Sequence, residues 1–138
     1  MQTINLAVVD DSAIYIDGLS LVLKQSNEIN LIYTVSSGEE FLKLLSKQKP
    51  DITLMDIKLP GIDGIKTTIE ALKINPGQKI IALTMHESPD FCNQMKAAGA
   101  YGYLLKKAGK NKIIETLKKV NAGEKVFQYQ TEEKEYEP

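Results

Sequence analysis

The sequence predicts an α/β fold in which one parallel β-sheet is covered by helices on both faces. Short apolar runs rich in β-branched residues alternate along the chain with segments of helical spacing. The first, third and fourth runs are apolar nearly throughout, as strands buried on both faces are. A helical segment separates each run from the next, which is the connection that parallel strands require. At 138 residues the chain is the size of one domain.

The first two strands are predicted at residues 4–9 and 31–35. Apolar residues at helical spacing follow each of them, over residues 13–25 and around residues 41–45. Ser37, followed three residues later by a glutamate, is a capping-box signature at the start of the second helix. Each of these helices should therefore pack one apolar face on the sheet.

The middle of the chain continues the same alternation. Residues 52–55 and 80–84 are predicted to be the third and fourth strands, with a helix over residues 65–72 between them. Asn75-Pro76-Gly77 is a stop-and-turn signal that ends this helix before the fourth strand begins.

The last units are a helix around residues 91–98, a fifth strand at residues 101–105 and a fifth helix around residues 113–120. Gly109 stands where a Ser, Thr or Asp cap of the fifth helix is expected. Five strand-and-helix units in strict alternation imply right-handed crossovers. We therefore expect a flavodoxin-like, doubly wound, five-stranded parallel sheet of order 2-1-3-4-5, in a three-layer α/β/α arrangement.

The predicted domain spans residues 1–127, and residues 128–138 are predicted to be a flexible acidic tail because they are polar and lack apolar periodicity. The formal net charge of −1 disfavours direct binding of nucleic acid. Cys92 is the only cysteine, so no internal disulfide is possible, and no run approaches the roughly 18 apolar residues of a membrane span. A cytoplasmic protein without membrane attachment is expected.

Polar residues close four of the predicted strands. They are Asp10 and Asp11 after the first strand, Asp56 after the third, Thr84 at the end of the fourth and Lys106 after the fifth. Ligands of doubly wound sheets bind at the carboxyl ends of the strands, where these side chains should meet. Three converging carboxylates repel one another unless a cation offsets them, and an all-oxygen ligand set suits Mg²⁺.

A carboxylate beside Mg²⁺, a lysine and a hydroxyl is suited to attack an activated phosphorus, because these groups neutralise charge on the transferring oxygens. Asp56 is the better candidate for the nucleophile, since it stands alone while Asp10 and Asp11 are adjacent. Taken singly, each residue also has an ordinary explanation: the Asp pair as loop or cap carboxylates, Lys106 as a surface lysine.

Four segments together resemble the receiver domain of two-component response regulators, over about residues 4–122. They are VVDDS (8–12), LMDIKLPGIDG (54–64), ALT (82–84) and GAYGYLLK (99–106). The stretches around residues 83–86 and 102–106 resemble the receivers of LuxR-type regulators most.

The resemblance implies that Asp56 takes a phosphoryl group as an acyl phosphate from a histidine kinase or a phosphotransfer protein. Asp10, Asp11, Asp56 and the backbone carbonyl of Lys58 would hold Mg²⁺. The protein would be a signalling switch and not an enzyme, catalysing only its own phosphorylation and dephosphorylation.

Further roles follow from the same resemblance. Thr84 and Lys106 would contact the phosphoryl oxygens, and Tyr103 would rotate inward as Thr84 moves. The face formed by the fourth helix, fifth strand and fifth helix would bind an output domain, a partner protein or a second copy in a homodimer.

Three alternatives stay open at this point. The chain can be the receiver fragment of a LuxR-type transcription factor, although no DNA-binding segment follows in this sequence. An aspartyl-phosphate phosphatase is disfavoured because its nucleophile belongs to an Asp-x-Asp pattern after the first strand, where this chain has Asp10-Asp11. A flavin or nucleotide module would need a glycine- or hydroxyl-rich phosphate loop there instead.

Overall fold

The computed structural model describes residues 3–127, and within this range the strands form one six-stranded sheet of order β2-β1-β3-β4-β5-β6. All of the neighbouring strands are parallel. The strands are β1 (Ile4–Val9), β2 (Ile29–Val35), β3 (Ile52–Met55), β4 (Lys79–Thr84), β5 (Gly102–Leu105) and β6 (Val126–Phe127). The helices are α1 (Ala13–Lys24), α2 (Gly38–Leu45), α3 (Gly64–Ile74), α4 (Pro89–Ala98) and α5 (Lys110–Asn121), with a 3₁₀ turn η1 (Lys106–Ala108) before α5.

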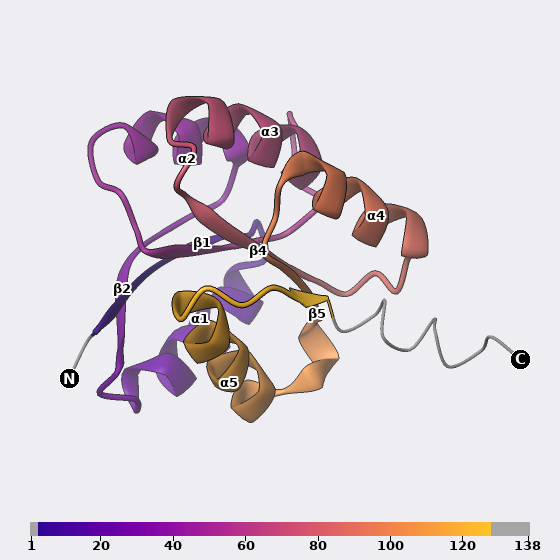
Figure 1. Cartoon of the computed structure of the whole chain (residues 1–138). Helices are drawn as coiled ribbons and strands as arrows, with labels where there is room; N and C mark the ends of the chain where they lie inside the picture. Colours follow the sequence, from indigo (N-terminus) through magenta and orange to yellow (C-terminus); the bar gives the residue numbers. More distant parts are fainter. Residues whose placement is uncertain (1–2, 128–138) are drawn as a thin grey trace, which may run out of the picture.

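The helices form two layers, one on each face of the sheet (Figure 1). The α2, α3 and α4 helices cover one face, and α1 and α5 cover the other. Each interface has its own apolar core. Leu23 of α1 and Leu117 of α5 lie in one core, whereas Phe41 of α2 and Met95 of α4 lie in the other. The β1, β3 and β4 strands are almost wholly buried, which confirms their predicted burial on both faces.

The α/β class and the strand order 2-1-3-4-5 are confirmed. The predicted cap of α2 is confirmed at Ser37, whose hydroxyl accepts the backbone N–H of Glu40 at 3.2 Å. The return bond of the predicted capping box is shifted by one residue, because the Glu40 carboxylate accepts the N–H of Ser36, the residue before the cap. The α3 helix ends at Ile74, directly before the turn signal. Gly109 is the residue before α5, with φ 89° and no side-chain cap.

The sixth strand was not predicted. The N–H of Val126 donates to the carbonyl of Tyr101 at 2.8 Å, and Phe127 is in register with Tyr103. Gly102 makes this pairing possible, because a Cβ there would lie 2.7 Å from the carbonyl oxygen of Val126. The β6 strand thus covers the edge of β5 that a five-stranded sheet would leave open.

The acidic tail and the absence of a membrane span are the remaining structural expectations. The predicted acidic tail, residues 128–138, lies outside the described residues. Over residues 3–127, none of the helices combines the length and the apolar character needed to cross a membrane.

Candidate functional site: an acidic cluster at the carboxyl ends of the strands

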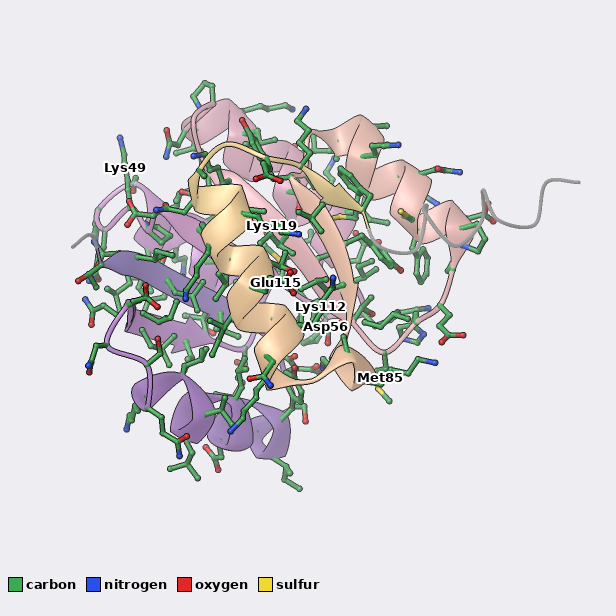
Figure 2. All side chains as sticks on the ribbon, turned by 60° about the horizontal axis from the view of Figure 1, so that its bottom comes forward. Lys49, Asp56, Met85, Lys112, Glu115 and Lys119 are labelled. Atoms are coloured by element: carbon green, nitrogen blue, oxygen red, sulfur yellow. The ribbon has the colours of Figure 1, made fainter. Side chains whose placement is uncertain are left out.

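Three carboxylates meet at the carboxyl edge of the sheet. Asp10 directly follows β1 and Asp56 directly follows β3, and oxygen atoms of Asp10, Asp11 and Asp56 all lie within 4.8 Å of one another. Asp10 and Asp56 are buried, whereas Asp11 is exposed. Figure 2 views the molecule with α5 in front and labels Asp56 at this edge. The fold therefore brings together the three aspartates that the sequence separates by up to 46 positions.

Lys106 completes the cluster from the end of β5. Its ammonium nitrogen lies 2.7 Å from Oδ2 of Asp10 and 3.3 Å from Oδ2 of Asp56, and the side chain is 12% exposed. A buried carboxylate pair is costly unless a cation lies between its members. Lys106 supplies one positive charge to a group of three negative charges, so the site keeps an excess of oxygen ligands suited to a hard divalent cation.

Backbone hydrogen bonds hold both buried aspartates in place. Asp10 donates its N–H to the carbonyl of Val35 at 3.0 Å, and Asp56 donates its N–H to the carbonyl of Val9 at 2.9 Å. The Asp56 carboxylate accepts the N–H of Ile57 at 2.8 Å. The positions of the acids are therefore set by the sheet and by the first turn after each strand.

Gly64 lets α3 begin against the backbone of Asp56. A Cβ at position 64 would overlap the carbonyl oxygen of Asp56 and press on Ile57, so a larger residue would push the helix away from the site. The N–H of Gly64 donates to the carbonyl of Ile57 at 2.8 Å, which closes the loop between β3 and α3. Glycine is needed at position 64 because there is no room for a Cβ, and not because of the backbone conformation, since the φ of Gly64 is not positive.

The electrostatics of Asp56 are balanced between opposing contributions. Burial raises the pKa of the Asp56 carboxyl above its ordinary value of 3.8, and the charge of Asp10 raises it further. The Lys106 ammonium and the N–H of Ile57 act in the opposite direction on the same pKa. Binding of a further cation would stabilise the ionised form, which is the form that acts as a nucleophile.

Thr84 and Tyr103 both bond to the loop after β4. The Thr84 hydroxyl accepts the N–H of His86 at 3.2 Å, and the Tyr103 hydroxyl donates to the carbonyl of His86 at 2.7 Å. Both side chains are fully buried, so the tyrosine ring points inward in this structure. The two side chains thus bond to the N–H and the carbonyl of the same residue, His86, in the loop between β4 and α4.

Lys58 lies beside the cluster on the loop after β3. Its ammonium is 5.4 Å from the centre of the Phe91 ring, at a pocket that His86 and Lys107 also line. This contact directs the lysine charge toward α4. The role of its backbone carbonyl as a metal ligand stays a prediction.

Tyr15 is a residue of the site that sequence reasoning missed. The ammonium of Lys106 lies 4.2 Å from the centre of the Tyr15 ring. Burial raises the pKa of the Tyr15 phenol to about 12, with further contributions from the charges of Asp10 and Asp56. The available signal was its place in the first turn after Asp10-Asp11, but an aromatic residue there is equally expected of an amphipathic helix.

Comparison with known proteins places the chain in a family. The model of the response regulator receiver domain matches residues 6–118. The response regulator GacA of Pseudomonas viridiflava is 35% identical over 122 residues, which cover 88% of this chain and 57% of GacA. The transcriptional regulatory protein DegU of Brevibacillus brevis is 29% identical over 120 residues, which cover 87% of this chain and 51% of DegU. This chain spans about half the length of these relatives.

Solved structures agree with the sequence comparison. A LuxR-family two-component response regulator from Aurantimonas sp. SI85-9A1 superposes with a TM-score of 0.87 at 26% identity, covering 91% of this chain and 89% of that one. The chain belongs to the receiver domain family of two-component response regulators, and its relatives include LuxR-type regulators. This membership confirms the expected family and sets the phosphatase and nucleotide-binding alternatives aside.

Proposed function

We propose that this receiver domain accepts a phosphoryl group on Asp56 from a histidine kinase or phosphotransfer protein, in a reaction that requires Mg²⁺. The observation that carries the proposal is the cluster itself, in which three carboxylates lie within 4.8 Å of one another and Lys106 contacts Asp10 and Asp56. An acidic cluster of this composition needs a cation, and Asp56 is the better candidate for the nucleophile because it stands alone after β3, whereas Asp10 and Asp11 form an adjacent pair.

In the proposed reaction an oxygen of Asp56 forms a bond to phosphorus while the bond between phosphorus and the donor nitrogen breaks, leaving a neutral imidazole after proton uptake. Asp10, Asp11, Asp56 and the carbonyl of Lys58 would hold Mg²⁺, which when bound would neutralise charge on the phosphoryl oxygens. The Lys106 ammonium would exchange its contact with Asp56 for one with a phosphoryl oxygen. The protein would thus catalyse only its own modification and its reversal.

The conformational response would begin at the loop after β4. A phosphoryl oxygen would accept the O–H of Thr84, and a turn of this hydroxyl toward it would strain the bond in which the hydroxyl accepts the N–H of His86. Because the Tyr103 hydroxyl donates to the carbonyl of the same His86, a shift of this loop would weaken the hydrogen bond that holds the tyrosine ring in its inward position. Phosphorylation would then select between two packings of the loop and the ring by its different interaction with each.

The output partner would bind the face of α4, β5 and α5, where β6 now covers the edge of β5. An output domain, another protein or a second copy in a homodimer is each a candidate, and the full-length relatives favour an attached output domain, as in a LuxR-type transcription factor. Cytoplasmic location belongs to the same proposal, because the phosphoryl donors of such switches act there.

Charge on α5 supports a protein partner over nucleic acid. Lys112 and Lys119 lie along α5 on either side of Glu115, as Figure 2 shows, at 3.9 and 3.4 Å from its carboxylate oxygens. Lys118 pairs with Glu28 at 2.7 Å. Two glutamates thus pair with three of the four lysines of α5, which weakens the positive field that phosphate contacts would need.

Intact-protein mass spectrometry after incubation with acetyl phosphate tests the proposal. We expect the wild type to gain one phosphoryl group when Mg²⁺ is present and none when it is chelated. Asp56→Asn should gain none, while Asp17→Asn, which removes an exposed carboxylate from α1, should behave as the wild type. Labelling of Asp56→Asn at the wild-type rate would contradict the site assignment.

A further inference from the structure

The backbone of Lys106 lies just beyond the paired part of β5. It follows the last β5 residue paired with β4, Leu105, and begins the short 3₁₀ turn η1, after which Gly109 has a positive φ. A pocket lies beside its side chain, lined by Ser12, Ile14, Tyr15, Met85, Leu105 and Lys107. The position of this long, flexible side chain therefore depends on the groups that its ammonium contacts.

The Tyr15 ring provides that contact. The ring centre lies 4.2 Å from the Lys106 nitrogen, whereas the other lysine–aromatic contacts among residues 3–127 measure 5.2 to 5.8 Å. Lys106 is also mostly shielded from water, at 12% side-chain exposure. A cation over a ring face is held more strongly when both are desolvated.

The position of the ring is itself coupled to the acidic cluster. Asp10 accepts the N–H of Ser12 at 2.8 Å through Oδ1, while its Oδ2 lies 2.7 Å from the Lys106 nitrogen. The Ser12 hydroxyl in turn accepts the N–H of Tyr15 at 3.3 Å as the cap of α1. One aspartate thus binds the lysine directly and anchors the helix turn that carries the ring.

We propose that Tyr15 is a positioning residue for phosphoryl transfer, whose ring face holds the Lys106 ammonium over Asp56. The inference rests on the proposed function, because it concerns how fast Asp56 is phosphorylated. Without the ring, the ammonium gains the adjacent pocket as an alternative position and spends less time where the phosphoryl oxygens arrive. An aliphatic residue such as leucine fills part of the space but has no negative ring face to attract the charge.

The test compares Tyr15→Leu, Tyr15→Phe and, as a control on the exposed side of the same helix, Leu21→Ala. Phosphorylation rates with acetyl phosphate and saturating Mg²⁺ are measured by intact mass, and folding is checked by thermal melting. We expect Tyr15→Leu to be slower by roughly 3- to 30-fold, the range that cation–π energies imply. Tyr15→Phe should restore most of the rate, and Leu21→Ala should match the wild type.

Proton NMR of the Lys106 ε-methylene supplies a readout that does not depend on phosphorylation. Its resonance should be displaced upfield by the ring in the wild type and in Tyr15→Phe, and return to an ordinary value in Tyr15→Leu. A folded Tyr15→Leu that keeps the wild-type rate would overturn the inference, and so would a Lys106 signal without ring displacement in the wild type. A wild type that takes no label, with the displacement present, would instead count against the proposed function alone.

Discussion

The surroundings of Asp56 include groups that destabilise its ionised carboxylate and groups that stabilise it. Burial and Asp10 raise the pKa of its carboxyl, while Lys106 and one backbone N–H lower it. The pKa is raised on balance, so between the unfolded and folded pKa values the folded state binds more protons than the unfolded state. Stability therefore falls as the pH rises through that window, and it stays reduced at neutral pH.

Replacing Asp56 by Asn should accordingly stabilise the protein at neutral pH when divalent cations are chelated. The neutral amide removes the repulsion with Asp10 and the cost of burying a charge. We expect a higher melting temperature for Asp56→Asn at pH 7, and a difference that shrinks as the pH falls toward 4. Asp17→Asn is the exposed control; a melting temperature of Asp56→Asn below that of the wild type at pH 7 would contradict the electrostatic argument.

The hydroxyl of Tyr103 should contribute measurably to stability. Tyr103→Phe keeps the buried ring but removes the donor to the His86 carbonyl at 2.7 Å. The expected loss is about 1 kcal/mol of the free energy of unfolding, measured by urea denaturation. Tyr33→Phe is the matched control, since its hydroxyl makes an exposed 3.4 Å contact with Gln48, and it should cost less than about 0.5 kcal/mol. Equal costs for the two variants would argue against the Tyr103 bond.

At the level of elements, hydrophobic patterning predicted the five longer strands and the five helices because each has enough residues to show a period. Two-residue β6 has no period, and its pairing depends on Gly102, which no local pattern reveals. The predicted start of the second strand missed Ile29 and Asn30 by two residues, because a polar residue interrupts the apolar run there. The rule that ligands bind at the carboxyl ends of the strands predicted that the aspartates would lie together. It gives no indication of Tyr15, which lies on a helix.

The pairing of β6 with β5 should break in Gly102→Ala. The added Cβ would lie 2.7 Å from the carbonyl oxygen of Val126, so β6 must move. We expect the Val126 amide, which donates to Tyr101, to lose protection from hydrogen exchange, while amides of β1 and β3 keep theirs. Unchanged protection at Val126 would show that the edge pairing is absent in solution or tolerates the methyl group.

The α1 helix should be stabilised by Gly18→Ala. Nothing lies within 4 Å of a Cβ at position 18, and the glycine is in the middle of the helix. Replacing a helical glycine by alanine is worth roughly 0.5–1 kcal/mol. Urea denaturation should show this gain without a change in the rate of labelling by acetyl phosphate. A loss of stability would mean that the exposed face of α1 packs differently.

At the scale of the whole molecule, the acidic site and the β5 edge lie in different parts of the sheet. Its carboxyl edge brings together the acids and Lys106. The loop between β4 and α4 connects this edge to Tyr103 on β5, the strand whose outer edge β6 covers. Two large apolar side chains near the cluster, Ile14 and Met85, are 88% and 72% exposed. A phosphoryl-donor protein would have apolar contacts available beside the acids.

The identity of the modified carboxylate is the decisive measurement, because three aspartates share the site. After incubation with acetyl phosphate and Mg²⁺, borohydride reduction converts an aspartyl phosphate to homoserine, which peptide mass spectrometry can place in the chain. We predict homoserine at position 56 alone, and none when Mg²⁺ is chelated. Homoserine at position 10 or 11, or modification that is independent of Mg²⁺, would contradict the assignment of Asp56 as the phosphoryl acceptor.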